Sequence, residues 1–362
     1  MNLDAIRAEI PVLERKAYLN TGTFGPLPRR SGEEVERWQR RSVEEGRAGH
    51  AFFEAAQELR AALRSRIGGL IGAPEGSVAL LGSTTEGCDV VAGGLGLGPG
   101  DEAVTTDVEH PGLFGALRVS GATVRVAEVR DRPAGEALDA IRAEITGRTR
   151  LVALSHVAWT TGAVLPIDEL ASDGVPVLVD GAQSAGAIPV DVSELGCDFY
   201  TVSGQKWLLG PDATGALYVR PDWTERLELT APSFLSWEDF AEWTPWPDAR
   251  RFESSWIPPG SLAGLLASLD FAESAGHERF ARARSMADMC RERLAERVEI
   301  VTEPGQGTLV SFRPEGDAGE VVERLAENDV IVRALPGVNW VRASCGFWTS
   351  EDEVERLAVG LG

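Results

Sequence analysis

The chain has 362 residues, enough for a large buried core and an α/β architecture with one large and one small lobe. Its formal net charge of −21 argues against nucleic acid or an anionic membrane surface as a partner, because both attract basic patches. The first fifteen residues read as an amphipathic helix broken by Pro11, and no apolar run is long enough to span a bilayer. We therefore expect a cytoplasmic protein without a membrane partner. The four cysteines lack paired spacing and predict neither a metal site nor disulfides: Cys88, Cys197, Cys290 and Cys345.

The first loop with ligand-binding character follows this helix. Asn20 opens an N-T-G run before a Gly/Pro turn, and residues 31–45 then read as a polar helix. The loop can face a ligand, or it can simply connect the two lobes.

A strand-to-helix turn rich in hydroxyls comes next. A helix over residues 51–70 leads into the strand VALLG, and Ser83, Thr84, Thr85 and Glu86 then open an apolar helix. Ser83 and Glu86 have the spacing of a helix capping box. Free backbone N–H groups and the positive helix end would also suit a phosphate at this turn, and the two roles are compatible.

Strands and helices then alternate, which predicts a largely parallel sheet. The strand after PGDE ends near His110; a lone histidine here would usually be a surface or capping residue. The strand VRVAEV, a helix over residues 137–145 and the strand RLVALSHV follow. The last of these ends in a polar segment that contains His156 and Trp159, either of which could instead pack in the core or anchor a loop.

Two chemically informative residues lie at the ends of the next strands. The apolar run VPVLV stops at Asp180, and a second run, Phe199 to Val202, ends in the glycine-flanked turn S-G-Q-K that carries Lys206. The only other lysine in the chain is Lys16, since arginine supplies all the remaining basic charge. An amine can lose its proton and attack a carbonyl, whereas a guanidinium cannot. A Schiff-base lysine with an aspartate for a pyridinium nitrogen is the arrangement that pyridoxal 5′-phosphate (PLP) requires.

At these residues the chain resembles the class V aminotransferases of PLP fold type I, which include cysteine desulfurases and isopenicillin N epimerases. The resemblance rests on D-G-A-Q at residues 180–183 and on S-G-Q-K-W at residues 203–207, followed by Gly210, Pro211 and Gly215. It implies a large, mostly parallel seven-stranded sheet domain over residues 15–245. It also implies a smaller α+β domain built from residues 1–14 and 246–362, and a homodimer.

The resemblance also implies roles for individual residues. Lys206 would form the internal aldimine and move protons, Asp180 would keep the ring nitrogen protonated, and His110 would stack on the ring. Contacts to the cofactor are implied for Ser83, Thr84, Thr85, His110, Asp180, Gln183, Ser203, Gln205 and Lys206. Gln205 departs from the histidine usual in the family, and an amide can donate to phosphate but brings no titratable charge.

The C-terminal part supplies the expected substrate contacts. From residue 230 to 256 the chain is irregular and tryptophan-rich, and Ser255-Trp256 stands where relatives place the Gly-Thr that reaches the neighbouring subunit. A long helix over residues 259–296 then precedes the small lobe. In the segment WVRASC, Arg342 matches the family's Arg-x-Ser motif and is expected to bind the substrate α-carboxylate. Further candidates for substrate binding are Asn20, His156 and Trp159.

Together these features predict a PLP-dependent enzyme acting on a free α-amino acid or a small compound carrying one. The reaction would proceed through an external aldimine and Cα deprotonation, in the manner of an aminotransferase or epimerase. One alternative is a β-eliminating C–S or C–Se lyase without a persulfide cysteine, because the loop over residues 333–339 contains no thiol. Another is a non-catalytic PLP-binding protein. We expect no metal.

Overall fold

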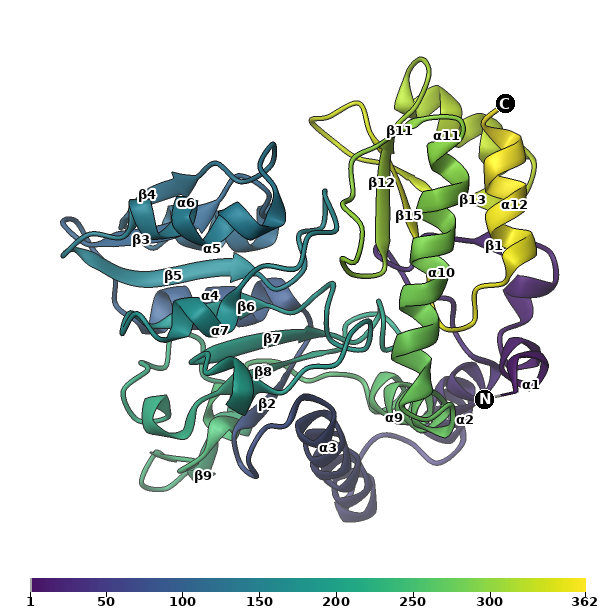
Figure 1. Ribbon diagram of the computed structural model, residues 1–362. Helices are drawn as coiled ribbons and strands as arrows, with labels where there is room; N and C mark the ends of the chain where they lie inside the picture. The colour runs from purple at the N-terminus through teal and green to yellow at the C-terminus, as the bar shows by residue number, and fades with distance from the viewer. Residues whose placement is uncertain (1) are drawn as a thin grey trace.

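Short apolar runs separated by helices form a seven-stranded sheet in the computed structural model, which describes residues 2–362 (Figure 1). The strand order is β2-β8-β7-β6-β5-β3-β4. The strands are β2 (Val78–Leu81), β3 (Glu102–Thr106), β4 (Thr123–Ala127), β5 (Thr149–Ser155), β6 (Val177–Asp180), β7 (Phe199–Ser203) and β8 (Gly215–Val219). Only β8 runs antiparallel to its neighbours, β7 and β2, so the mostly parallel sheet is confirmed.

Helices cover both faces of this sheet, which explains why its strands are apolar without interruption. In β2, for example, Val78 and Leu80 belong to one buried cluster and Ala79 and Leu81 to the other. The first cluster contains residues of α3 (His50–Ile71), α6 (Ala137–Glu144), α7 (Ile167–Ala171), α8 (Val192–Leu195) and α9 (Pro259–Ser274). The second contains residues of α4 (Thr84–Gly94) and α5 (Pro111–Val119).

The second part of the molecule is built on a smaller, four-stranded antiparallel sheet with the order β11-β12-β15-β14 (Figure 1). Its strands are β11 (Glu299–Ile300), β12 (Leu309–Arg313), β14 (Arg333–Ala334) and β15 (Val341–Ser344). The helices α10 (Glu278–Ala295), α11 (Ala318–Glu327) and α12 (Glu351–Gly360) share a buried core with it. No helix formed by residues 2–362 combines the length and the apolar character needed to cross a membrane.

The N-terminal segment connects the two parts of the molecule. It contains α1 (Leu3–Ala8), a 3-10 turn (Pro11–Glu14), β1 (Ala17–Tyr18) and α2 (Arg29–Glu44). The strand β1 pairs in parallel with β13 (Val330–Ile331), whereas α2 packs along α9. Because α9 also joins the core of the large sheet, residues 246–274 have contacts on both sides of the expected boundary. The division into residues 15–245 and residues 1–14 with 246–362 stays a prediction.

The single long helix expected over residues 259–296 is wrong, because the structure has two helices there, α9 and α10. Gly276 lies between them with a φ of 72°, a left-handed conformation that glycine adopts without a steric penalty. The irregular segment before α9 contains 3-10 turns at Phe234–Ser236 and Ala249–Phe252, and the short hairpin strands β9 (Trp237–Asp239) and β10 (Thr244–Pro245).

Candidate active site

The carboxyl ends of β5, β6 and β7 bring the candidate residues to one edge of the large sheet. In the parallel register, Ser155 lies opposite Asp180, and Asp180 lies opposite Thr201. The turn that carries Lys206 begins directly after β7. In open α/β sheets this is the edge where ligands bind.

Asp180 is buried at this edge, with 4% of its surface exposed. Its Oδ1 accepts hydrogen bonds from the backbone N–H of Ala182 at 2.9 Å and from the hydroxyl of Thr201 at 3.3 Å. Among the hydrogen bonds of residues 2–362, none involves Oδ2. The carboxylate is thus oriented through one oxygen, and the other is left for a donor such as a protonated ring nitrogen.

Lys206 sits in a turn whose backbone is held on both sides. Gly204 donates its N–H to the carbonyl of Thr214 at 2.8 Å, and a Cβ on Gly204 would lie 2.1 Å from the Thr214 hydroxyl oxygen. Burial lowers the pKa of the Lys206 amine to about 8; the charge of Asp180 opposes this shift, and Arg342 and Arg333 add to it. A neutral amine, the form that attacks carbonyls, is therefore accessible near neutral pH.

His110 caps the N-terminus of α5, where its Nδ1 accepts a hydrogen bond from the N–H of Gly112 at 3.1 Å. Its ring is T-shaped to that of Trp159, with 5.4 Å between the ring centroids, and the residue is exposed to solvent. The surrounding protein nevertheless lowers the pKa of His110, through burial first and then through the charge of Lys206, with Asp180 opposing. A neutral, solvent-exposed imidazole at this position fits a planar cofactor ring.

Ser83 caps α4, but the capping box expected from Ser83 and Glu86 is incomplete, because Glu86 reaches the N–H of Gly82 instead of that of Ser83. The Ser83 hydroxyl accepts from the N–H of Glu86 at 3.1 Å, while Glu86 Oε2 accepts from the N–H of Gly82 at 2.6 Å. Within the described chain the hydroxyls of Thr84 and Thr85 make no hydrogen bond, and Thr85 is exposed. The helix N-terminus thus has two free hydroxyls that could bind a phosphate.

The Gln183 side chain joins two loops, whereas the Gln205 side chain bonds within its own turn. Gln183 donates from Nε2 to the carbonyl of Gly22 at 2.8 Å, and its Oε1 accepts from the indole N–H of Trp207 at 2.9 Å. One N–H of that amide remains for a ligand. The Ser203 hydroxyl donates to Oε1 of Gln205 at 2.9 Å, which orients the Gln205 amide nitrogen away from Ser203.

Arg342 is a buried cation without an acidic partner. Its side chain is 1% exposed, and it donates to the carbonyl of Trp159 at 2.8 Å and to the hydroxyl of Thr23 at 3.4 Å. Its Nε has no hydrogen-bond partner, and no ion pair among residues 2–362 includes it. Burial, together with the charge of Arg333, lowers the pKa of Arg342 to about 9.

Arg333 lies opposite Arg342 in the β14–β15 pairing and donates to the same Thr23 hydroxyl, at 3.0 Å. Two guanidinium groups that have no carboxylate partner among residues 2–362 therefore converge on one hydroxyl, in a chain that has 56 acidic residues. An unpaired buried charge is costly, so this arrangement favours an anionic ligand.

The remaining substrate-binding candidates have different positions. Asn20 accepts from the Thr23 hydroxyl at 2.7 Å and so belongs to the arginine cluster, and Trp159 joins that cluster through its carbonyl. His156 is buried with its Nδ1 3.2 Å from the Tyr200 hydroxyl. Among residues 2–362, the His156 side chain has no hydrogen bond or ring contact with the arginines or Lys206, so its role as a substrate contact stays a prediction.

Sequence reasoning missed two members of this group. Thr23 lies in the loop that was recognised at Asn20, and its contacts with arginines some 310–319 positions away could not be read from the chain. Glu109 directly precedes His110 and accepts hydrogen bonds from Thr106 and Ser155. The only sign of Glu109 in the sequence was its position directly before His110.

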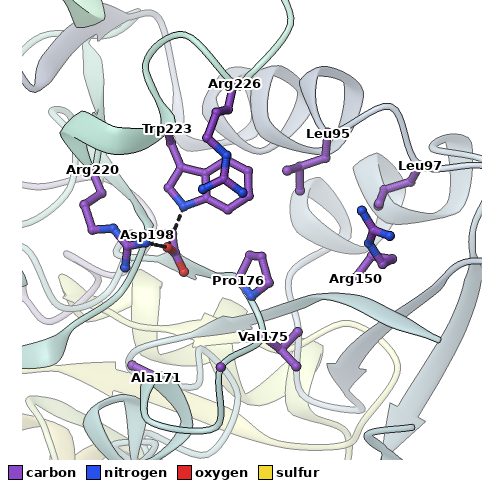
Figure 2. A pocket seen from close by; sticks show the side chains of 11 residues that line it. Leu95, Leu97, Arg150, Ala171, Val175, Pro176, Asp198, Arg220, Trp223 and Arg226 are labelled. Carbon is purple, nitrogen blue, oxygen red and sulfur yellow. Dashed lines mark hydrogen bonds and ion pairs between the residues drawn. The ribbon is translucent and has the colours of Figure 1, made fainter. Parts of the chain in front are cut away.

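A separate cavity of about 510 Å³ lies at the other edge of the large sheet (Figure 2). Pro176, which precedes β6, and Asp198, which precedes β7, line it together with Trp223 and the guanidinium of Arg226, 3.8 Å from a Trp223 ring centroid. Because these residues stand at strand starts, this cavity is distinct from the edge that carries Asp180 and Lys206.

Comparison with known proteins agrees with this geometry. The sequence profile described as Aminotransferase class-V matches residues 27–357. Isopenicillin N epimerase of Streptomyces clavuligerus is 33% identical over 95% of this chain and 93% of its own length. Cysteine desulfurase of Haloferax volcanii is 29% identical over 100% of this chain and 96% of its own length.

Solved structures give the same result. The complex of the cystine C–S lyase C-DES with its reaction product cysteine persulfide has a TM-score of 0.93 and 31% identity, covering 97% of this chain and 98% of that chain. A lysine-to-alanine mutant of C-DES with glycine covalently linked to the PLP cofactor has a TM-score of 0.92 and 30% identity, covering 98% of both chains. The chain therefore belongs to the class V aminotransferase family, and its cofactor is pyridoxal 5′-phosphate.

Proposed function

We propose that this chain is an enzyme that removes the Cα proton of a free α-amino acid, or of a small amino-acid-like compound, in an aminotransferase- or epimerase-like reaction. The observation that carries the proposal is Arg342. A buried guanidinium without an acidic partner, in a cluster whose charges also lower the pKa of Lys206, suits the α-carboxylate of a substrate.

The residues at the sheet edge divide the work between them. When bound, PLP supplies a carbonyl carbon for an amine and a ring that accepts the electron pair left at Cα. Lys206 would hold the cofactor and then carry the proton at Cα, because its amine has a pKa of about 8. Asp180 would hold the ring nitrogen through its free Oδ2, and the imidazole of His110 would stack on the ring.

Other residues would bind the phosphate and the substrate. Ser83, Thr84 and Thr85 stand at the N-terminus of α4, where backbone N–H groups favour an anion. Ser203 and Gln205 lie on the turn of Lys206, and Gln183 has one free N–H for the ring's phenolate oxygen. Asn20, Trp159 and Thr23 would hold Arg342 in place for the substrate carboxylate.

A panel of amino acids tests the proposal. The purified protein loaded with PLP is mixed with each L- and D-amino acid in deuterated water, and deuterium at Cα is followed by mass spectrometry together with the visible spectrum. Exchange at Cα with at least one amino acid supports the proposal. A protein that binds PLP but exchanges no Cα proton would be a non-catalytic PLP-binding protein.

We propose β-elimination at a C–S bond as the second candidate. All four cysteines are buried, and the loop over residues 335–339 carries no thiol, so a persulfide on the protein is not expected. Elimination needs no protein thiol, and the structural relative C-DES is named a cystine C–S lyase. Incubation with cystine should then release cysteine persulfide as the leaving group together with pyruvate and ammonia, and leave every cysteine of the protein unmodified by mass spectrometry. Transamination would instead give the keto acid, and epimerisation the other enantiomer.

We also propose a cytoplasmic homodimer. Large apolar side chains are exposed near the site loop and on the β9–β10 hairpin, among them Phe24 at 50%, Leu27 at 42% and Trp243 at 63%. Patches of this kind often mark protein interfaces. The four free cysteines are typical of a reducing compartment. Light scattering coupled to size exclusion would give twice the chain mass of 38.8 kDa, and a monomer mass at micromolar concentration would rule out the dimer.

A further inference from the structure

Glu109 ties the turn of His110 to the strand next to Asp180. Its Oε1 accepts from the Thr106 hydroxyl at 2.6 Å, and its Oε2 accepts from both the N–H and the hydroxyl of Ser155, at 2.9 and 2.6 Å. Thr106 ends β3 and Ser155 ends β5, so one carboxyl joins two neighbouring strands at the edge that carries the site.

The two groups that this carboxyl connects have different expected contacts with the cofactor: His110 would stack on the ring, and Asp180 would hold the ring nitrogen. Glu109 is bonded directly to His110 in the chain, and its partner Ser155 lies in register with Asp180. The backbone N–H of the next residue, His156, donates to the carbonyl of Asp180 at 3.0 Å, which locks the two strand ends together. A displacement of Glu109 would therefore move the imidazole relative to the aspartate.

The electrostatic surroundings distinguish Glu109 from a purely structural carboxylate. Burial raises the pKa of Glu109 to about 7, its hydrogen bonds to Ser155 and Thr106 oppose the rise, and the charge of Asp180 adds to it. The titratable groups that face it are Asp180 on β6, Cys88 on α4 and His110 on its own turn. The Cys88 thiol stays neutral because burial raises its pKa. Glu109 is thus a second negative charge that appears beside Asp180 near neutral pH.

We propose that Glu109 is a positioning residue for the proposed reaction: through Ser155 and the turn of His110 it fixes Asp180, which would hold the ring nitrogen, and His110, which would stack on the ring. The inference rests on the proposed roles of Asp180, His110 and Lys206. It assigns no contact between Glu109 and the substrate, so the effect should fall on turnover and on the environment of the ring rather than on amino-acid affinity.

Two variants separate shape from charge. Glu109→Gln keeps the side-chain length and removes the charge, and Glu109→Asp keeps the charge but is too short to reach both Ser155 and Thr106. The matched control is Glu102→Gln, since Glu102 is a buried glutamate at the other end of β3 that also accepts from a threonine hydroxyl, that of Thr146 at 2.6 Å, away from the site edge. Ser155→Ala removes the hydroxyl hydrogen bond to Glu109 while the backbone N–H of residue 155 still donates, and this variant serves if a Glu109 variant fails to fold.

The readouts are the pH titration of the visible cofactor band, its visible circular dichroism, kcat, and the Kd for a bound amino acid. Glu109→Gln should move the spectral midpoint to lower pH, because a nearby negative charge favours protonated forms. Glu109→Asp and Ser155→Ala should lower kcat about 10- to 100-fold and change the visible dichroism, because misplaced groups lose productive geometry. The Kd should stay within about twofold of the parent in all of them, and Glu102→Gln should match the parent in every spectral readout.

Unchanged spectral midpoint, dichroism and kcat in both Glu109 variants would overturn the inference. Loss of amino-acid affinity with unchanged kcat would overturn it as well, because Glu109 would then act on the substrate. Borohydride labelling of Lys206 in the parent separates this outcome from failure of the proposed function. A parent without the Lys206 label refutes the function itself, whereas a labelled parent with silent Glu109 variants refutes only the role of Glu109.

Discussion

Lys206 is one of only two lysines in a chain whose other basic side chains are arginines. Burial lowers its pKa to about 8, while the charge of Asp180 opposes the shift. Since only the neutral amine attacks a carbonyl, the protein without cofactor should capture PLP faster as the pH rises. We expect the capture rate to increase about tenfold per pH unit below about 8 and to level off above it.

Stopped-flow absorbance at the visible cofactor band measures this rate from pH 6 to pH 10. Borohydride reduction and peptide mapping then identify the labelled lysine, which should be Lys206. A label on Lys16, or a capture rate that does not change with pH, would contradict the assignment.

Hydrogen bonds to Oδ1 orient the Asp180 carboxylate at the sheet edge, and among the hydrogen bonds of residues 2–362 none uses Oδ2. Asp180→Asn keeps the shape and the hydrogen bonds to Ala182 and Thr201 but removes the charge that would hold a protonated ring nitrogen. We expect the variant to keep its cofactor and to lose about 100-fold or more of its turnover, as is typical when a preorganised charge is removed. Turnover is measured under saturating amino acid, and near-normal rates would show that the ring nitrogen is not held in this way.

Arg342 should bind the substrate carboxylate, and its variants should show this in affinity. Arg342→Ala should weaken amino-acid binding by about 2–5 kcal/mol, which is about 30-fold or more, and Arg342→Lys should restore little because an ammonium lacks the bidentate fork. The cofactor spectrum without substrate should stay as in the parent. Spectral titration with amino acid measures the affinity. If Arg342→Ala binds amino acids as tightly as the parent, Arg342 does not hold the substrate carboxylate, and Arg333 becomes the next candidate.

At the scale of elements, the alternation of strands and helices predicted the parallel sheet, because both periodicity and strand-end turns are local signals. The break at Gly276 was not predicted: the apolar pattern continues on both sides of it, and only the backbone conformation reveals two helices. The pairing of β1 with β13 could not be predicted from the sequence either, since it joins residues more than 300 positions apart.

The same distinction applies to the site. Asp180 and Lys206 were found because each follows an apolar strand and belongs to a short motif. Thr23 and Glu109 were not predicted because their roles depend on contacts between distant parts of the chain. Thr23 links Asn20 to two distant arginines, and Glu109 links two strands. Local pattern therefore predicts groups that lie at strand ends, and it misses groups that act through partners brought near by the fold.

The loop around Gly25 gives a test at this scale. Gly25 donates to the carbonyl of Gln205 at 2.8 Å, and a Cβ at Gly25 would lie 2.1 Å from the carbonyl oxygen of Lys206. That contact is with backbone, so the loop and the lysine turn must separate if a methyl group is added. Gly25→Ala should therefore lower PLP occupancy and turnover about tenfold or more while the helical circular dichroism is kept.

Gly32→Ala on α2 is the control, because its Cβ would meet only the flexible Leu27 side chain at 3.9 Å. Alanine in a helix interior should raise the free energy of unfolding by about 0.5–1 kcal/mol and leave cofactor binding unchanged. If Gly25→Ala binds PLP like this control, the two loops do not depend on each other.

At the scale of the whole molecule, two buried groups titrate in the same pH window with opposite effects on stability. Burial lowers the pKa of His156 to about 4 from 6.5, so the folded protein binds fewer protons than the unfolded chain between these values. Burial raises the pKa of Glu109 to about 7 from 4.5, so between these two pH values the folded protein binds more protons than the unfolded chain. Stability rises with pH wherever the unfolded state binds more protons, and it falls in the opposite case.

The contribution of His156 thus increases the free energy of unfolding as the pH rises from about 4 to 6.5, and that of Glu109 decreases it from about 4.5 to 7. Each shift corresponds to about 3 kcal/mol, so the two nearly cancel in the parent. His156→Asn removes the rising contribution and should make the protein lose stability, relative to the parent, as the pH increases through this window. Glu109→Gln removes the falling contribution and should show the opposite trend. Thermal midpoints from pH 4.5 to 7.5 measure both trends, and the double variant should follow the parent. If the midpoints of the single variants change with pH as those of the parent do, neither group is held in its neutral form by burial.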